Sequence, residues 1–223
     1  MIKHIHLNEC DSTQEVLKEQ LNNSPVSECI VVSCETQNAG RGRGNNKWTS
    51  MPGTVCFSMN IEPHIVPSYT ALEVSVILAK FFETKGKKIA LKWPNDILNE
   101  NRKKCAGVLI QGNQNYLITG VGINLFSKHE EFGAVFSSLI NPDKRVWSGE
   151  MAEYINNNRY QNVEFLRQDW LTRCGHLNQM VQISEGAEVY EGVFQGIGLH
   201  GEAEVCIDGS IKHIFNGSLK ILT

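Results

Sequence analysis

Lys92-Trp93-Pro94-Asn95-Asp96 is the stretch of this 223-residue chain that says most about its fold. It follows the apolar run Ile89 to Leu91, so a strand would end in an X-Pro turn that presents a cation, an amide and a carboxylate together. A magnesium nucleotide needs these groups: lysine for phosphate, and amide or carboxylate oxygens for the metal or its water. Taken alone, the pentapeptide is equally well a hairpin turn capped by an Asn or Asp side chain.

A second motif, Gly40-Arg41-Gly42-Arg43-Gly44-Asn45-Asn46-Lys47-Trp48, lies in a segment over 36–53 whose glycines predict a long loop. The glycines leave backbone N–H groups accessible close to three cations, so the loop could enclose an anion. It matches neither the phosphate-loop nor the dinucleotide-binding pattern. A flexible basic surface loop, or an RNA-contacting segment, explains the run as simply. Trp48 favours a loop that orders over a ligand, because a large aromatic side chain needs an apolar face to cover.

Two further motifs are weaker on their own. Lys103-Lys104-Cys105-Ala106-Gly107 is a basic pair that leads into a strand of small residues, and Gly120-Val121-Gly122-Ile123-Asn124 follows it. Separately they indicate a solvated charge pair and a glycine-rich strand. Their order after the first two motifs carries more information than either motif alone.

The composition excludes several classes of protein. Twenty-one basic and 24 acidic residues give a net charge of −3, so the chain offers no broad cationic surface for nucleic acid. The seven scattered cysteines lack a Cys-x-x-Cys pair, which is typical of reduced thiols in a cytosol. The amino terminus does not resemble a signal peptide, and no apolar stretch reaches the roughly 20 residues that span a bilayer. We therefore predict a cytoplasmic protein without a membrane segment.

Hydrophobic periodicity predicts an α+β chain in two parts. Strands are expected over 2–7, 29–34, 54–61, 89–93, 97–98, 105–111 and 116–121, and helices over 12–22, 68–83 and within 149–174. Closely spaced β runs then follow over 181–183, 188–195, 202–207, 211–215 and 219–222, separated by glycines. We predict an antiparallel or mixed sheet with flanking helices over 1–178 and a small β-barrel over 179–223.

Taken in order, the four motifs resemble the catalytic core of biotin protein ligases. Gly-Arg-Gly-Arg followed by Trp, then Lys-Trp-Pro-Asn-Asp, Lys-x-x-Gly and Gly-x-Gly-Ile-Asn carry this likeness, which spans about residues 8 to 125. The resemblance implies the family's catalytic fold, which is similar to that of class II synthetases, followed by a small SH3-like β-barrel. Too few residues precede Ser12 for a winged helix, so we expect the monofunctional type, without a DNA-binding domain and without DNA as a partner.

The resemblance also implies roles for individual residues. Those expected to bind biotin and ATP are Ser12, Thr13, Gln14, Gln37, Gly40, Arg41, Gly42, Arg43, Trp48, Asn95, Lys104, Gly107, Gly122 and Asn124. Those expected to be catalytic are Arg43, Lys92, Asp96 and Lys104, with Asn95 and Asp96 as ligands of Mg²⁺. Lys104 lies three positions before Gly107 as in the motif, whereas counting forward from Asp96 selects Lys103. The uncharged Gly44-Asn45-Asn46 replaces a more basic family pattern, which puts retention of the reaction intermediate in question.

The reaction implied by the resemblance has two steps. Biotin and ATP would give biotinyl-adenylate and pyrophosphate, and a lysine of a biotin carboxyl carrier protein would then take the biotinyl group. Asp96 is a hypothetical aid to deprotonation of that lysine. A lipoate or octanoate ligase is the nearest alternative, and an RNA-binding module is an alternative of another class. The sequence leaves open the identity of the carrier and whether the chain forms a homodimer.

Overall fold

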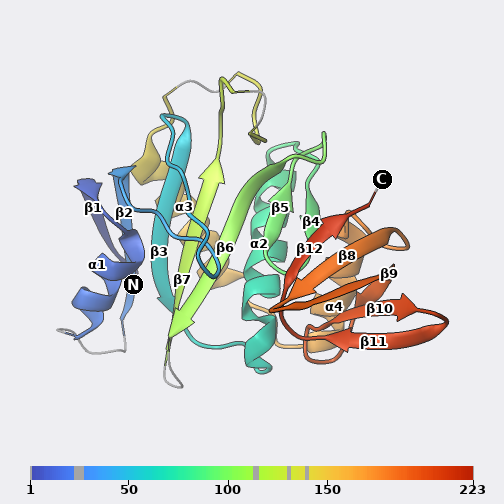
Figure 1. The fold of residues 1–223 in the computed structure, drawn as a ribbon. Coiled ribbons are helices and arrows are strands. Elements are labelled where there is room, and N and C mark those ends of the chain that lie inside the picture. The colour runs from blue at the N-terminus through green and yellow to red at the C-terminus, as the bar shows by residue number, and fades with distance from the viewer. Residues whose placement is uncertain (1, 23–27, 113–115, 130–131, 139–140, 223) are drawn as a thin grey trace.

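The computed structural model describes residues 2–22, 28–112, 116–129, 132–138 and 141–222, and it contains two sheets (Figure 1). The first sheet has the order β1-β2-β3-β7-β6-β5-β4 and is mixed, because β1 and β2 are parallel and the other pairs are antiparallel. Its strands are β1 (Ile2–Cys10), β2 (Cys29–Gln37), β3 (Thr54–Ile61), β4 (Ala90–Lys92), β5 (Asp96–Leu98), β6 (Lys104–Gly112) and β7 (Leu117–Asn124).

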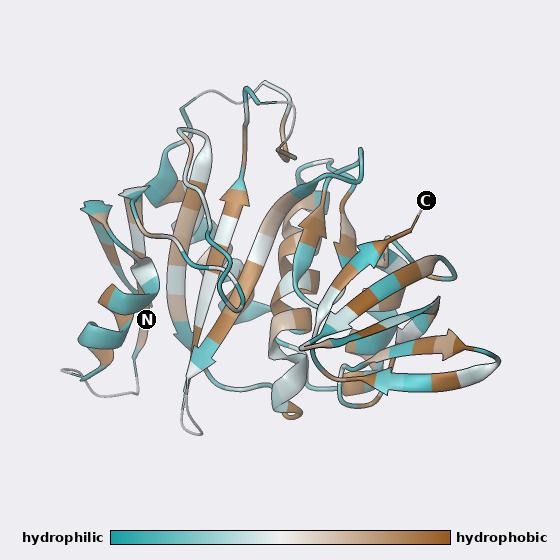
Figure 2. Cartoon of the chain, viewed as in Figure 1, coloured by the Kyte–Doolittle hydropathy of each residue, from teal (hydrophilic) through white to brown (hydrophobic). Residues whose placement is uncertain are grey.

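Helices cover both faces of this sheet. They are α1 (Thr13–Asn22), α2 (Thr70–Thr84), which follows the 3₁₀ turn η1 (Pro67–Tyr69), α3 (Lys144–Asn157) and α4 (Val163–Arg173). On one face α1 packs Leu17 and Leu21 against β2 and β7, while α2 and α3 form the main core on the other. In Figure 2, α2 is mostly hydrophobic, because other elements cover it on two sides. By contrast, α1 is largely hydrophilic on its visible side, because only its opposite side packs against the sheet.

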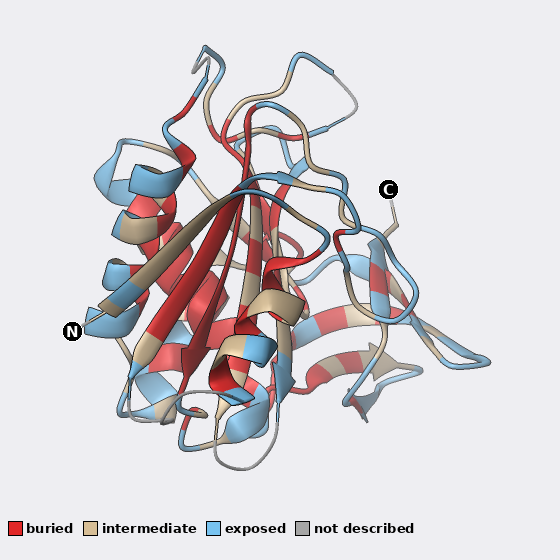
Figure 3. Cartoon of the chain, turned by 90° about the vertical axis from the view of Figure 1, so that its left-hand side faces the viewer, coloured by how far each residue is buried: buried red, intermediate tan, exposed pale blue. Residues whose placement is uncertain are grey.

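Strand β3, between β2 and β7 in the sheet, is buried along its whole length (Figure 3). Val55 and Phe57 face the main core. Cys56 and Ser58 point to the opposite face of the sheet, because successive side chains of a strand alternate. The thiol of Cys56 and the hydroxyl of Ser58 are thereby buried inside the protein. That face of β3 contributes to the pocket described below.

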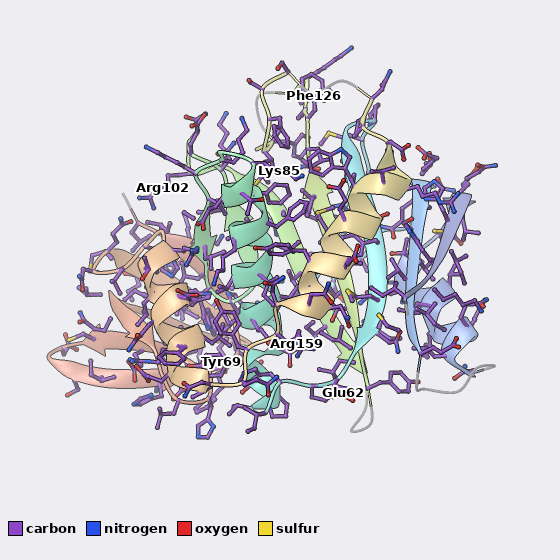
Figure 4. The ribbon with its side chains drawn as sticks, turned by 180° about the vertical axis from the view of Figure 1, so that it is seen from behind. Glu62, Tyr69, Lys85, Arg102, Phe126 and Arg159 are labelled. Atoms are coloured by element: carbon purple, nitrogen blue, oxygen red, sulfur yellow. The ribbon has the colours of Figure 1, made fainter. Side chains whose placement is uncertain are left out.

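A buried ion pair joins α2 to the segment between α3 and α4. Glu73 of α2 is fully buried and accepts hydrogen bonds from Arg159 Nη2 at 2.7 Å and from the Tyr160 backbone N–H at 2.7 Å. Arg159 also donates to the carbonyl of Glu62, at the lower edge of the view in Figure 4. A buried carboxylate is tolerated only when it is paired in this way. The segment between α3 and α4 is thus anchored to α2.

The second sheet is antiparallel, with the order β11-β10-β9-β8-β12. Its strands are β8 (Met180–Glu185), β9 (Glu188–Ile197), β10 (Ala203–Ile207), β11 (Ser210–Ile214) and β12 (Ser218–Ile221). Closure into an SH3-like barrel is not confirmed, because β12 returns to pair with β8 and leaves β11 and β12 as the two edges. None of the described helices is long and apolar enough to cross a membrane.

The two sheets share one hydrophobic core. Phe194 and Val205 of the second sheet belong to the same buried cluster as Trp93 and Trp170. The indole of Trp93 donates a hydrogen bond to the carbonyl of Gly201 at 2.9 Å, so the turn after β4 is held by the second sheet. Because the core is continuous between the two sheets, the domain boundary predicted near residue 178 stays a proposal.

Acid is expected to destabilise the protein through His176. This fully buried imidazole lies against Trp170 and Phe194, and its burial, with the charges of Lys92 and Arg102, lowers its pKa to about 3. Between about pH 6.5 and about pH 3 only the unfolded chain takes up this proton, so the free energy of unfolding falls by up to about 1.4 kcal/mol per pH unit.

Denaturant unfolding at about pH 4 to 7 measures this slope. His176→Leu should flatten it, whereas His200→Gln, at an exposed histidine, should leave it unchanged. An unaltered slope in His176→Leu would contradict the assignment.

Candidate active site

The loop between β2 and β3 crosses in front of β7 and β6 (Figure 1) and covers a cavity of about 490 Å³. The walls come from the start of α1, this loop, strands β3, β6 and β7, the turn between β4 and β5, and the turn before β12. The predicted residues that line it are Ser12, Thr13, Gln14, Gln37, Arg41, Gly42, Arg43, Trp48, Lys92, Asn95, Asp96, Lys104, Gly107 and Gly122. Segments far apart in the sequence thus meet at one cavity.

One end of the cavity carries an ordered set of neutral polar groups. Gln37 Oε1 accepts hydrogen bonds from the Thr13 backbone N–H at 3.0 Å and from Thr13 Oγ1 at 3.3 Å. Thr13 Oγ1 also lies 2.8 Å from Ser58 Oγ. Such a set suits a ligand with a polar edge and an apolar body.

Trp48 forms a wall in the middle of the cavity. Its backbone N–H donates to the Gly40 carbonyl at 2.9 Å, and its ring lies over Gly122, with Lys104 Nζ 5.8 Å from a ring centroid. The indole N–H is buried and has no hydrogen-bond acceptor of normal geometry among the described residues, although Trp48 interacts weakly with the Cys56 thiol. An unsatisfied buried donor costs free energy that a ligand acceptor could recover.

Gly122→Ala is expected to displace this indole. A Cβ at Gly122 would lie 2.3 Å from Trp48 Cε2, which is closer than real atoms approach. We expect red-shifted tryptophan emission, stronger acrylamide quenching and a free energy of unfolding lower by about 1–3 kcal/mol. Gly107→Ala is the matched control, because its Cβ would meet Trp48 and Lys104 at ordinary distances of 3.5–3.6 Å. Equal spectra for the two variants would contradict this packing.

The other end of the cavity is charged. Asp96 is largely buried and lies between Lys92, whose Nζ is 3.0 Å from Oδ2, and Lys104, whose Nζ is 2.5 Å from Oδ1. In the pairing of β5 with β6, Ile97 pairs with Ala106 and Leu98 pairs with Lys104, so the bulge residue Cys105 lies in β6, between Lys104 and Ala106. Lys104 lines the cavity, whereas Lys103 is not among its lining residues.

Arg43 reaches across the cavity from the loop. Its Nη1 donates to Asn95 Oδ1 at 3.3 Å, and its Nη2 donates to the carbonyl of Gly217 at 2.8 Å. Burial lowers the pKa of the guanidinium, against the opposing attraction of Asp96. Arg41 instead pairs with Glu15 of α1 at 2.6 Å and is more exposed.

Two predicted residues do not line the cavity. Gly40 belongs to the covering loop, and a Cβ there would meet the Trp48 carbonyl oxygen at 2.3 Å. Asn124 is buried, accepts a hydrogen bond from Thr54 Oγ1 at 2.8 Å, and donates to the Gly133 carbonyl. Both positions therefore support the backbone around the site.

The structure adds lining residues that were not among the predicted site residues. They are Gly44, Asn46, Lys47, Cys56, Ser58, Trp93, Pro94, Val108, Leu109, Gly120, Val121, Gly217, Ser218 and Leu219. Ser58 had a usable signal, because a hydroxyl in the middle of an apolar strand needs a buried partner. Gly217 to Leu219 had none, since nothing local relates them to residues more than 100 positions earlier.

The balance of charge defines the chemistry of the cavity. Among the described residues, five basic side chains line it, Arg41, Arg43, Lys47, Lys92 and Lys104, and Asp96 is the acidic one. Such a site stabilises anions, including carboxylate and phosphate groups and negative charge that develops during a reaction. The neutral polar end and the cationic end together fit an uncharged head group that carries an acid.

Residues 8–125, more than half of the chain, match the biotin/lipoate A/B protein ligase family, and the chain belongs to this family. Its fold is similar to that of the biotin protein ligase from Aquifex aeolicus in complex with biotin and ATP, with a TM-score of 0.76 and 26% identity, covering 99% of both chains.

Two curated proteins are similar to this chain in sequence. The bifunctional ligase/repressor BirA of Bacillus subtilis is 34% identical over 131 residues, which are 54% of this chain and 40% of that protein. The biotin–[acetyl-CoA-carboxylase] ligase of Paracoccus denitrificans is 24% identical over 199 residues, 74% of this chain and 79% of that protein. The chain thus spans less than half the length of the Bacillus relative.

Proposed function

We propose that this protein is an ATP-dependent biotin protein ligase that forms biotinyl-5′-AMP and transfers biotin to a lysine of a carrier protein. The observation that carries the proposal is the two-ended cavity, in which Thr13, Gln37 and Ser58 lie at one end and Lys92, Asp96 and Lys104 at the other. The neutral end suits the ureido ring of biotin, and the cationic end suits its carboxylate beside the phosphates of ATP.

In the first step a carboxylate oxygen of biotin attacks the α-phosphorus of ATP, and pyrophosphate leaves. Negative charge develops on the phosphoryl oxygens, where the ammonium groups of Lys92 and Lys104 and the guanidinium of Arg43 stabilise it. Asp96 holds both lysines in place before ATP binds, which reduces the reorganisation that the reaction requires. No nucleophile of the protein takes part.

In the second step the amine of the acceptor lysine attacks the acyl carbon, and AMP leaves. The amine must be neutral to attack, and Asp96 is the acidic group at the cavity that can accept its proton. The Cys56 thiol lines the same cavity, but burial raises its pKa, so it is not a competing nucleophile at neutral pH.

Magnesium fits this site as a companion of the nucleotide. Among the described residues no cluster of three or more His, Cys, Asp or Glu side chains could hold an ion unaided, which agrees with a metal bound mainly by phosphates. Asp96 would contribute a carboxylate oxygen, while the side-chain oxygen of Asn95 already accepts from Arg43. When bound, the ion would neutralise charge on the phosphates.

The remaining predictions complete the proposal. A biotin carboxyl carrier protein is the acceptor that we infer, and seven free cysteines support a cytoplasmic location. The net charge of −3 supports the absence of DNA binding. An SH3-like character of the second sheet, a boundary near residue 178 and a homodimer stay predictions.

The proposal is tested with purified protein, ATP, biotin and a biotin carboxyl carrier domain, using intact-mass spectrometry. We expect one biotinyl adduct on the carrier, and none on a carrier whose target lysine is replaced by arginine. The parallel arm offers lipoate and a lipoyl domain. Modification of the lipoyl domain without modification of the biotin carrier would instead identify a lipoate ligase.

A further inference from the structure

The turn between β11 and β12 closes the charged end of the cavity from the second sheet. Gly217, Ser218 and Leu219 line the cavity, and the Gly217 carbonyl accepts the hydrogen bond from Arg43 Nη2 at 2.8 Å. The loop that covers the ligand site is thereby attached to a main-chain oxygen 174 positions later in the chain. This carbonyl, together with Asn95 Oδ1, therefore fixes where the Arg43 guanidinium lies.

The end of β8 fixes that carbonyl. Gly217 has a φ of +141°, and a Cβ there would lie 2.8 Å from Ile183 Cγ2 and from the Ser184 carbonyl oxygen. The preceding Asn216 backbone N–H donates to Glu185 Oε1 at 3.2 Å. The Glu185 carboxylate thus holds the turn one residue before the carbonyl that binds Arg43.

We propose that Glu185 is a positioning residue for Arg43, acting through the Asn216–Gly217 turn, and that it limits escape of the acyl-adenylate before transfer. The part of this inference that concerns the adenylate rests on the proposed function. Glu185 does not line the cavity, so it contacts neither substrate. The covering loop carries the uncharged Gly44-Asn45-Asn46 next to Arg43, and Arg41 is directed to Glu15 on α1. Arg43 is therefore the loop arginine that reaches the charged end of the cavity, and the second sheet holds it through the Gly217 carbonyl.

Trypsin cleavage tests the contact without using the activity. Trypsin cuts after Arg41 and Arg43, and mass spectrometry distinguishes the products. In Glu185→Ala we expect the rate of cleavage after Arg43 relative to Arg41 to rise about three- to tenfold, because one hydrogen bond to a charged group is lost. Glu185→Gln keeps an acceptor oxygen and should restore most of the protection. Glu188→Ala, an exposed acid of the same β8–β9 hairpin, is the matched control and should behave as the unaltered protein.

The same variants test the consequence for the intermediate. With biotin and radiolabelled ATP but no carrier, Glu185→Ala should release biotinyl-adenylate into solution about three- to tenfold faster, with Glu185→Gln close to the unaltered protein. Equal cleavage ratios in all four proteins, or a Glu185→Gln variant as defective as Glu185→Ala, would overturn the positioning role. If the unaltered protein forms no adenylate, the proposed function fails, whereas the cleavage ratio still decides whether Glu185 holds Arg43.

Discussion

Replacing Lys104 with methionine is expected to lower the rate of biotin-dependent pyrophosphate release by about 100- to 1000-fold, the usual effect of removing one charged donor that stabilises a transition state. Lys104 Nζ lies 2.5 Å from Asp96 Oδ1 and 5.8 Å from a Trp48 ring centroid, so it belongs to the charged end of the cavity, where we propose that the carboxylate and the phosphates bind. Methionine keeps the length and apolar character of the side chain. Asp96 also keeps its contact with Lys92, so the fold should persist.

Lys103→Met is the matched control for this prediction. Lys103 is adjacent in sequence and exposed, but it is not a lining residue of the cavity. We expect its rate to stay within about threefold of the unaltered protein, since surface charges contribute little. A large loss in Lys103→Met with normal activity in Lys104→Met would reverse the assignment of the two lysines.

Trp93→Ala is expected to lower the free energy of unfolding by about 3–5 kcal/mol, the usual range for a buried tryptophan. Trp93 is 1% exposed, belongs to the core that both sheets share, and donates to the Gly201 carbonyl at 2.9 Å. Its loss would leave a cavity where the turn after β4 meets the second sheet. Urea unfolding followed by circular dichroism measures the change.

Trp93→Phe separates packing from hydrogen bonding at this position. It keeps most of the apolar volume but leaves the Gly201 carbonyl without its donor, so we expect a smaller loss of about 1–3 kcal/mol. Losses of equal size in the two variants would mean that the ring contributes little beyond its N–H group.

Much of the fold follows from local patterns. The strand predicted over 54–61 is confirmed as β3 with the same bounds, and the helix over 12–22 is confirmed as α1 within one residue. The helical region over 149–174 is two helices, and the first begins five residues earlier than predicted, because Asp143 caps it by accepting from the Val146 backbone N–H. A cap outside the apolar pattern is easily missed.

Pairing between distant strands could not be predicted. The glycine-separated runs after Met180 correctly predicted five strands, but their periodicity does not say whether β12 pairs with β11 or only with β8. The contribution of Gly217 to the cavity depends on that pairing, so no local pattern predicts it. The mixed first sheet with its helices is confirmed.

The candidate site was predictable where motifs are contiguous. The Lys92–Asp96 segment and the Gly40–Trp48 loop do meet at one cavity. The roles of their residues stay predictions, and the choice between Lys103 and Lys104 required the contact of Lys104 with Asp96 at the cavity, which no local pattern reveals. Ser58 and Gly217 enter the cavity through strand alternation and sheet packing, which are tertiary properties.

Pyrophosphate release from ATP measures the proposed formation of biotinyl-adenylate at this cavity. The purified chain is compared with biotin, with lipoate and without an added acid, alongside an Arg43→Glu variant that reverses the charge at the cavity. We expect release that requires biotin and falls sharply in the variant. Release that requires lipoate instead, or no acid-dependent release at all, would contradict it.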